Sequence, residues 1–169
     1  MAKYLEATAA GVVQEVQPVN TSAGAGDAAK IPELDAAGKL DASMIPAGFG
    51  GDVETVVASE NLAANDLVNI WDDAGTRKMR KADASLGRLA DGFVLAAVIA
   101  AASGSCYMDG TITGMTGLTI GSRYFLSGAA AGTATLTAPT TSTHHVQDVG
   151  KAISATELSF EPGRSIIRV

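Results

Sequence analysis

Closely spaced turn-forming residues in the C-terminal part of this 169-residue chain limit its secondary structure to short segments. Glycine permits positive φ and proline lacks a backbone N–H, so both interrupt regular elements. These residues recur every few positions: Gly110, Gly114, Gly117, Gly121, Gly128, Gly132, Pro139, Gly150, Pro162 and Gly163. The β-type runs between them cover residues 105–108, 123–126, 133–137, 146–154, 157–160 and 165–169. Many short strands between close turns are typical of a β-sandwich or small β-barrel, and they leave little room for crossover helices.

The middle of the chain alternates as strands do. Val53, Thr55 and Val57 are two residues apart, so they would share one face of a strand. Residues 67–80 predict a β-hairpin whose turn lies at 72–75, where the sequence is Asp-Asp-Ala-Gly. The apolar run at 89–98 predicts a further strand, although its alanines favour a helix. We therefore expect a mainly β fold, a single antiparallel β-sandwich or small β-barrel domain over residues 52–169.

The first 51 residues lack this pattern and predict an extended N-terminal arm. Pro32 and Pro46 interrupt the segment, and residues 35–38 favour a turn because Asp can accept a local hydrogen bond and Gly accepts positive φ. No helix of useful length with a continuous apolar face fits between the prolines. The apolar side chains must therefore dock on something else. The residues that we expect to bind a partner are Val12, Val13, Ile31, Leu34, Leu40, Met44 and Ile45.

Composition and charge point to association with protein and not with nucleic acid. Hydrophobic residues make up 47% of the chain, but many are alanines and only 5% of the chain is aromatic, so a core gains little burial energy per residue. Such a protein gains stability by associating. The formal net charge of −6 argues against phosphate binding. The densest basic stretch, at residues 77–81, is flanked by Asp72, Asp73 and Asp83, which indicates a solvated strand face.

Templates for catalysis, cofactors and metals do not fit the sequence. Cys106 is the single cysteine, so neither an internal disulfide nor a cysteine metal cluster can form, and we expect an inert thiol buried in a strand. His144 and His145 are adjacent, lack metal-site spacing and follow a polar run, which favours an exposed loop pair. Trp71, Tyr107 and one of the adjacent pair Tyr124 and Phe125 are expected to serve the core. We expect no enzyme, no catalytic residue, no cofactor and no metal.

Membrane and secretory segments are not expected either. A single lysine precedes no apolar run at the N-terminus, so residues 1–6 do not resemble a secretory signal. The most apolar stretch, residues 93–102, is about half the length that a transmembrane helix requires. The sequence predicts a soluble protein made in the cytoplasm.

Two stretches resemble tailed-bacteriophage capsid decoration (cement) proteins. Residues 30–46, KIPELDAAGKLDASMIP, are similar to a segment that joins an N-terminal arm to a β domain in phage virion proteins. The second resemblance covers the β domain. Its matching segments are 90–94 (ADGFV), 117–127 (GLTIGSRYFLS), 138–140 (APT), 147–152 (QDVGKA) and 154–158 (SATEL). Similar β modules also occur in phage tail fibres.

The resemblance implies a structural protein that assembles as a homotrimer on the outside of the virion capsid. There it would bind the major capsid protein and clamp neighbouring capsid subunits against the pressure of the packaged DNA. A tail-fibre or baseplate module that binds a receptor is the closest alternative. A glycan-binding β domain from outside a virus is the second alternative.

Overall fold

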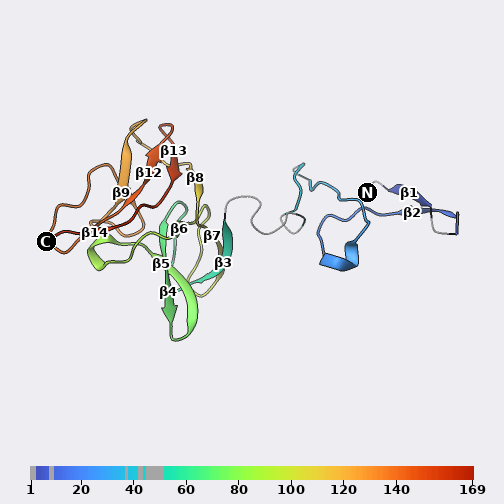
Figure 1. The fold of residues 1–169 in the computed structure, drawn as a ribbon, viewed down its shortest axis with the longest axis horizontal. Helices are drawn as coiled ribbons and strands as arrows, with labels where there is room; N and C mark the ends of the chain where they lie inside the picture. The colour runs from blue at the N-terminus through green and yellow to red at the C-terminus, as the bar shows by residue number, and fades with distance from the viewer. Residues whose placement is uncertain (1–2, 8–9, 37, 42–43, 45–51) are drawn as a thin grey trace. The chain divides into compact units, whose positions relative to one another are not determined.

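The computed structural model describes residues 3–7, 10–36, 38–41, 44 and 52–169. The chain divides into two units, Met1–Phe49 and Gly50–Val169, which we call the arm and the β unit. Strands and short 3-10 turns make up the regular structure of both units (Figure 1). The predicted mainly β fold is therefore confirmed.

The arm contains a short antiparallel hairpin where the sequence predicted only an extended segment. Strand β1 (Tyr4–Ala7) pairs with β2 (Val13–Val16), and a 3-10 turn, η1 (Gly24–Asp27), follows. Farther along, Val19 accepts a hydrogen bond from Glu33 N at 2.8 Å and donates one to the Ile31 carbonyl at 3.0 Å. These elements of the arm were not predicted, because hydrogen bonds between backbone groups do not require a periodic pattern of apolar residues.

The turn predicted at residues 35–38 is present. The Asp35 carbonyl accepts a hydrogen bond from Gly38 N at 2.9 Å, and its Oδ1 accepts one from Lys39 N at 2.8 Å. Gly38 has a φ of 73°, in the left-handed region that favours glycine. Asp35 and Gly38 therefore stabilise the turn as predicted from their residue types.

The first half of the β unit is a small closed barrel. Its strands, in order around the barrel, are β3 (Val53–Ala58), β5 (Thr76–Lys81), β4 (Leu67–Asp73), β6 (Gly92–Phe93) and β7 (Ser103–Tyr107). The β3–β5 pair is parallel and the other pairs are antiparallel. The predicted hairpin is β4–β5. Its two-residue turn, Ala74 and Gly75, has φ values of 52° and 85°, as a type I′ turn requires.

The second half is a five-stranded antiparallel sheet. Its strand order is β10 (Ala134–Thr135), β9 (Arg123–Leu126), β12 (Asp148–Ala152), β13 (Glu157–Phe160) and β8 (Gly110–Thr113). The bounds of β9 and β13 coincide with the predicted runs. Two further strands, β11 (His145–Val146) and β14 (Ile166–Ile167), form a separate antiparallel pair that we call the C-terminal ribbon. A 3-10 turn, η3 (Ala84–Leu86), begins after Asp83, whose side chain accepts a hydrogen bond from Ser85 N.

The strand predicted at residues 89–98 is largely absent. Only Gly92 and Phe93 form a strand, and Val98 makes an isolated bridge to Leu62. Gly92 lies so close to strand β7 that a Cβ there would approach the Tyr107 carbonyl oxygen to 2.6 Å. The apolar residues of this segment are buried at several separate points along an irregular path. A run of apolar residues looks the same in the sequence whether it forms a strand or such an irregular segment.

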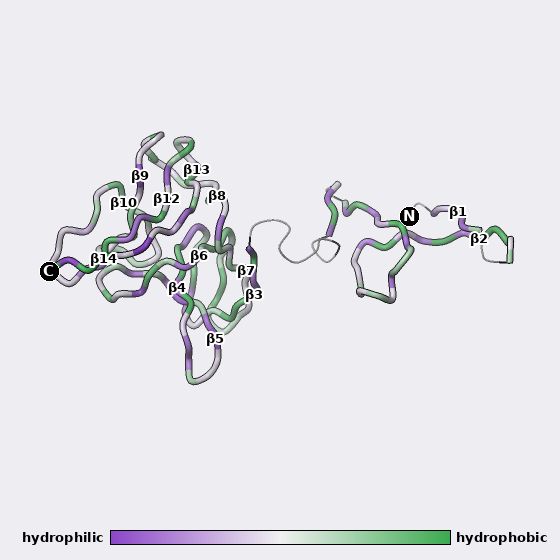
Figure 2. Tube along the Cα trace, viewed as in Figure 1, coloured by the Kyte–Doolittle hydropathy of each residue, from purple (hydrophilic) through white to green (hydrophobic). Residues whose placement is uncertain are grey.

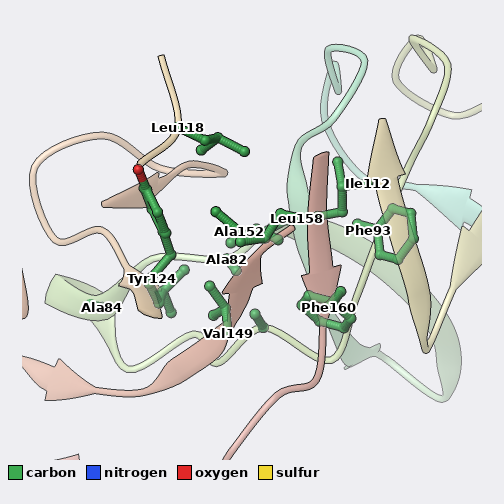
Figure 3. Close-up of a cluster of buried hydrophobic side chains, with 13 residues drawn as sticks. Ala82, Ala84, Phe93, Ile112, Leu118, Tyr124, Val149, Ala152, Leu158 and Phe160 are labelled. Carbon is green, nitrogen blue, oxygen red and sulfur yellow. The ribbon is translucent and has the colours of Figure 1, made fainter. Parts of the chain in front are cut away.

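Two apolar cores lie on opposite sides of the barrel wall. Along β4, Leu67 belongs to the core shared with the five-stranded sheet, whereas Val68 belongs to the core inside the barrel. Phe93 and Val94 divide in the same way, because successive side chains of an extended chain point to opposite sides. Figure 3 shows the sheet-side core, where Phe93 and Phe160 lie edge to face with centroids 5.3 Å apart.

We predict that Gly150→Ala destabilises the β unit far more than Gly117→Ala. Both glycines have positive φ, but a Cβ on Gly150 would overlap the Ser159 carbonyl oxygen, whereas a Cβ on Gly117 would meet open space. At Gly117, the backbone strain of an alanine with positive φ should lower the free energy of unfolding by about 1 kcal/mol. At Gly150, the same strain together with the steric overlap should lower it by at least ~3 kcal/mol. Urea unfolding followed by Trp71 fluorescence measures both. Equal losses would contradict the close approach of Gly150 to β13, the strand that contains Ser159.

Cys106 gives a second prediction, on pH dependence. Its thiol is buried in the barrel core, and desolvation raises its pKa to about 11 from an ordinary value of 9.0. The folded state thus binds the proton more tightly than the unfolded state, so the stability contribution is full below pH 9 and declines as pH rises toward 11. The free energy of unfolding should therefore fall more steeply between pH 9 and 11 in the wild type than in Cys106→Ala. Parallel pH profiles of the two proteins would be the contrary result.

Candidate functional site

The arm exposes apolar side chains that no described part of the arm covers. None of its described residues is buried. The exposed large apolar residues, with their exposed fractions, are Leu5 (72%), Val12 (62%), Val13 (62%), Ile31 (50%), Leu34 (57%) and Leu40 (41%). A side chain of this kind gains free energy when a partner removes it from water. The arm therefore has the properties of a binding element.

Two of the predicted residues, Ile31 and Leu34, come together in a shallow hollow of about 310 Å³. Tyr4, Pro18 and Pro32 complete its apolar lining, and its charged lining residues are Lys3 and Glu33. The two backbone hydrogen bonds of Val19 hold the segment after β2 beside residues 31–33 and so assemble this site. Sequence reasoning missed Tyr4 and Pro18 because they lie far from residue 31 along the chain.

The other predicted arm residues are not gathered in the hollow. Val12 and Val13 lie at the end of the hairpin loop and the start of β2, and Leu40 follows the turn at Asp35. Met44 is half-buried, whereas Ile45 falls outside the described residues. Leu5, the most exposed large apolar residue described in the arm, was not predicted. The arm thus offers its apolar surface in at least two places, the hollow and the hairpin.

The basic stretch on β5 is neutralised by neighbouring strands. Arg77 pairs with Glu54, and Lys78 Nζ lies 2.5 Å from Asp73 Oδ2. Lys81 Nζ lies 3.2 Å from Asp66 Oδ2. Arg80 donates a hydrogen bond to Asn69 Oδ1 and stacks over Trp71, with its guanidinium carbon 4.5 Å from the ring centroid. These basic side chains therefore form ion pairs and hydrogen bonds on the surface of the barrel, in line with the solvated strand face expected for them.

The histidine pair is not the exposed loop pair that the sequence predicted. Both side chains are half-buried, and His145 lies in strand β11. Its Nδ1 is 3.5 Å from Ser165 Oγ, and its ring contacts Gly87 next to η3. The ring of His144 packs against Gly128. The two rings turn to different neighbours, so they cannot bind one ion together.

Buried polar groups of the β unit have structural partners. Gln147 donates from Nε2 to the Ala90 carbonyl at 3.0 Å and accepts from Ala90 N at 2.8 Å. Asp66 accepts from Ala63 N at 2.7 Å. Among the described residues, no buried side-chain nitrogen or oxygen lacks a hydrogen-bond partner. These polar groups therefore tie loops to the sheets.

Aromatic side chains are divided between the core and the barrel surface. Tyr124 is buried and its hydroxyl accepts a hydrogen bond from Thr119 N at 2.9 Å, while its neighbour Phe125 is half-buried. Tyr107 stacks on Phe93 with centroids 5.3 Å apart. Trp71 is half-buried on the barrel surface under Arg80. The expected core role thus holds for Tyr107 and Tyr124 and only partly for Trp71.

The part of the chain that the structure describes contains neither a metal-binding cluster nor a membrane-spanning helix. There, no group of three or more His, Cys, Asp or Glu side chains is placed to hold a metal ion. None of the described helical segments is long and apolar enough to cross a bilayer.

Comparison with known protein families, with curated proteins and with solved structures finds no match to this chain. We therefore infer the function of the chain from its own residues and from the resemblance in residues 30–46 and in the β unit.

We predict that serine at Ile31, Leu34 and Leu40 together leaves the β unit as stable as before. These side chains are exposed in the arm, so their replacement removes no packing contact from either core. The change in the free energy of unfolding should stay within about 0.5 kcal/mol. Trp71 fluorescence during urea unfolding reports on the β unit alone. A loss above about 1 kcal/mol would mean that the three residues pack on that unit.

Proposed function

We propose that this chain is a structural protein of a tailed-phage virion that binds the outer surface of the capsid. In this proposal it forms a homotrimer, and its arm clamps neighbouring subunits of the major capsid protein. The observation that carries the proposal is the arm, whose described residues include large exposed apolar side chains and no buried residue. The resemblance of residues 30–46 to the arm junction of phage decoration proteins supports the same assignment.

Burial of the arm supplies enough free energy for such a role. Removing a large apolar side chain from water contributes about 1.5–3 kcal/mol, and immobilising a side chain costs about 0.5–1.5 kcal/mol. Each exposed leucine or isoleucine of the arm therefore adds to the affinity if its partner packs well. The described backbone pairing at Val19 lowers the cost, because part of the arm is ordered before it binds.

The β unit supports the proposal as a body that keeps its shape when the arm binds. Its two cores share the barrel wall, so deforming the barrel disturbs both of them. The closed barrel also leaves none of its described strands with an open edge. A clamp needs such a body, because a flexible one would not transmit force between two capsid subunits.

The location is tested by cryo-electron microscopy of phage particles that co-purify with the chain. We expect density for it on the outer capsid surface, at positions that contact more than one capsid subunit. Density at the tail tip would overturn the proposal in favour of a receptor-binding module. A free chain with affinity for sugars would exclude both phage assignments.

The role of the arm is tested by co-sedimentation with expanded capsids that lack the chain. Serine at Leu5, Val12 and Val13, which are exposed on the hairpin of the arm, should weaken capsid binding by roughly 100-fold or more, because three buried contacts are lost. The matched control places serine at Ile120, Leu136 and Ile153, which are exposed on the β unit. The control should bind as the wild type does. Equal binding by the arm variant and the wild type would exclude the arm as the clamp.

A further inference from the structure

The C-terminal ribbon is a second surface that is incomplete in the single chain. Ile166 and Ile167 of β14 are 67% and 59% exposed. Within the described residues β14 pairs only with β11, so its outer edge has no strand beside it. A two-stranded ribbon is marginally stable by itself, and an open edge readily pairs with another chain. This ribbon therefore has the properties of a docking surface.

The ribbon is basic in a chain whose formal net charge is −6. The hydrogen bond from Arg168 N to the His144 carbonyl, 3.0 Å long, extends the ribbon beyond β14. Arg168 lies two residues from Ile166, so both side chains project from the same face. Residues 143–147 and 163–169 contain Arg164 and Arg168 but no Asp or Glu. Neither arginine has an ion pair with another described residue.

The hollow of the arm has the complementary features. Its lining is apolar, formed mainly by Tyr4, Ile31 and Leu34. Of its two charged residues, Lys3 already pairs with Glu15, with Nζ 2.7 Å from Oε2. Glu33 forms no ion pair within the described part of the chain. The hollow thus offers an apolar surface with one acidic group left for a partner.

We propose that the hollow in the arm of one copy binds the C-terminal ribbon of a second copy. Ile166 enters the apolar lining, and Arg168, on the same face of the ribbon, pairs with Glu33. This inference rests on the proposed function in one respect, that the arm is the element that holds other proteins. It adds that one of those proteins is the chain itself, while the hairpin with Leu5, Val12 and Val13 stays available for the capsid.

Charge favours this occupant over a second ribbon. Two ribbons do not suit each other, because Arg164 and Arg168 would face the same residues of the partner and like charges across a strand pair are destabilising. An arm-to-ribbon contact is heterologous, so repeating it closes a ring of copies or extends a filament.

The first test is sedimentation equilibrium of the intact chain, which we expect to associate beyond its monomer mass of 17.0 kDa. Ile166→Ser and Arg168→Glu should each weaken association roughly tenfold. Ile120→Ser is the matched control for the first variant, since Ile120 is also 67% exposed, and Lys151→Glu, at an exposed cation of β12, is the control for the second. A monomeric wild type, or controls that weaken association as much as the variants, would overturn the proposal.

Charge reversal tests the pairing itself. Glu33→Arg alone should weaken association, and Glu33→Arg combined with Arg168→Glu should restore most of it. Circular dichroism checks that each variant keeps the β fold. If the combined variant associates no better than the single ones, Glu33 and Arg168 are not partners and the proposed geometry is wrong.

Disulfide trapping distinguishes a second copy from the chain's own arm. Leu34→Cys and Ile166→Cys are made on separate chains and mixed under mild oxidation, and a cross-linked dimer is expected. Native Cys106 should stay unreacted because it is buried and its pKa is raised to about 11. If the doubly substituted chain instead forms its bond within one molecule at high dilution, the ribbon binds the arm of its own chain.

The two proposals can fail separately. A chain that associates through the ribbon but binds no capsid would keep this inference and overturn the proposed function. A chain that decorates capsids as a trimer, with Ile166→Ser associating and binding like the wild type, would keep the proposed function and overturn this inference.

Discussion

The wall of the small barrel is the constraint on which the β unit depends. Its strands must satisfy two cores at once, because Leu67 and Val68 are neighbours and point to opposite sides. The interior side is tightly packed at two glycines: a Cβ on Gly92 would approach Cys106 Sγ to 2.8 Å, and one on Gly104 would overlap Val98. The outer side carries larger residues such as Phe93, which meets the five-stranded sheet (Figure 3). One short stretch of wall thus joins barrel and sheet into one body.

Sequence reasoning located the strands where glycine or proline delimits a β-branched or aromatic run. Strands β9 and β13 have the predicted bounds, and the β4–β5 hairpin has its turn within the predicted residues. It failed at residues 89–98, where apolar residues are buried along an irregular path. The predicted run at 146–154 merged Val146 of β11 with β12, and His145 was left out because two histidines after a polar run carry no strand signal. The pairing partner of β11 lies about twenty residues away, and only the folded chain shows it.

Only part of the binding surface of the arm can be located from the sequence alone. Its apolar residues were identifiable because no local periodicity explained them, and those that the structure describes are exposed or, for Met44, half-buried. The hollow was not identifiable, since it needs the backbone bonds of Val19 to place Pro18 and Tyr4 near Ile31. Figure 2 shows apolar segments within the arm and at the C-terminal ribbon. Such surfaces suit a protein that works by contact with other chains.

The central claim is that the apolar side chains of the arm become buried only when the protein associates. Hydrogen exchange of the backbone amides, measured on the isolated monomer and on assembled or capsid-bound protein, tests it most directly. We expect the amides of the monomer's arm, including β1 and β2, to exchange faster than those of the β unit and to become strongly protected after assembly, with the β unit protected in both states. An arm that is as protected as the β unit in the monomer, or one that gains no protection on the capsid, would contradict this claim.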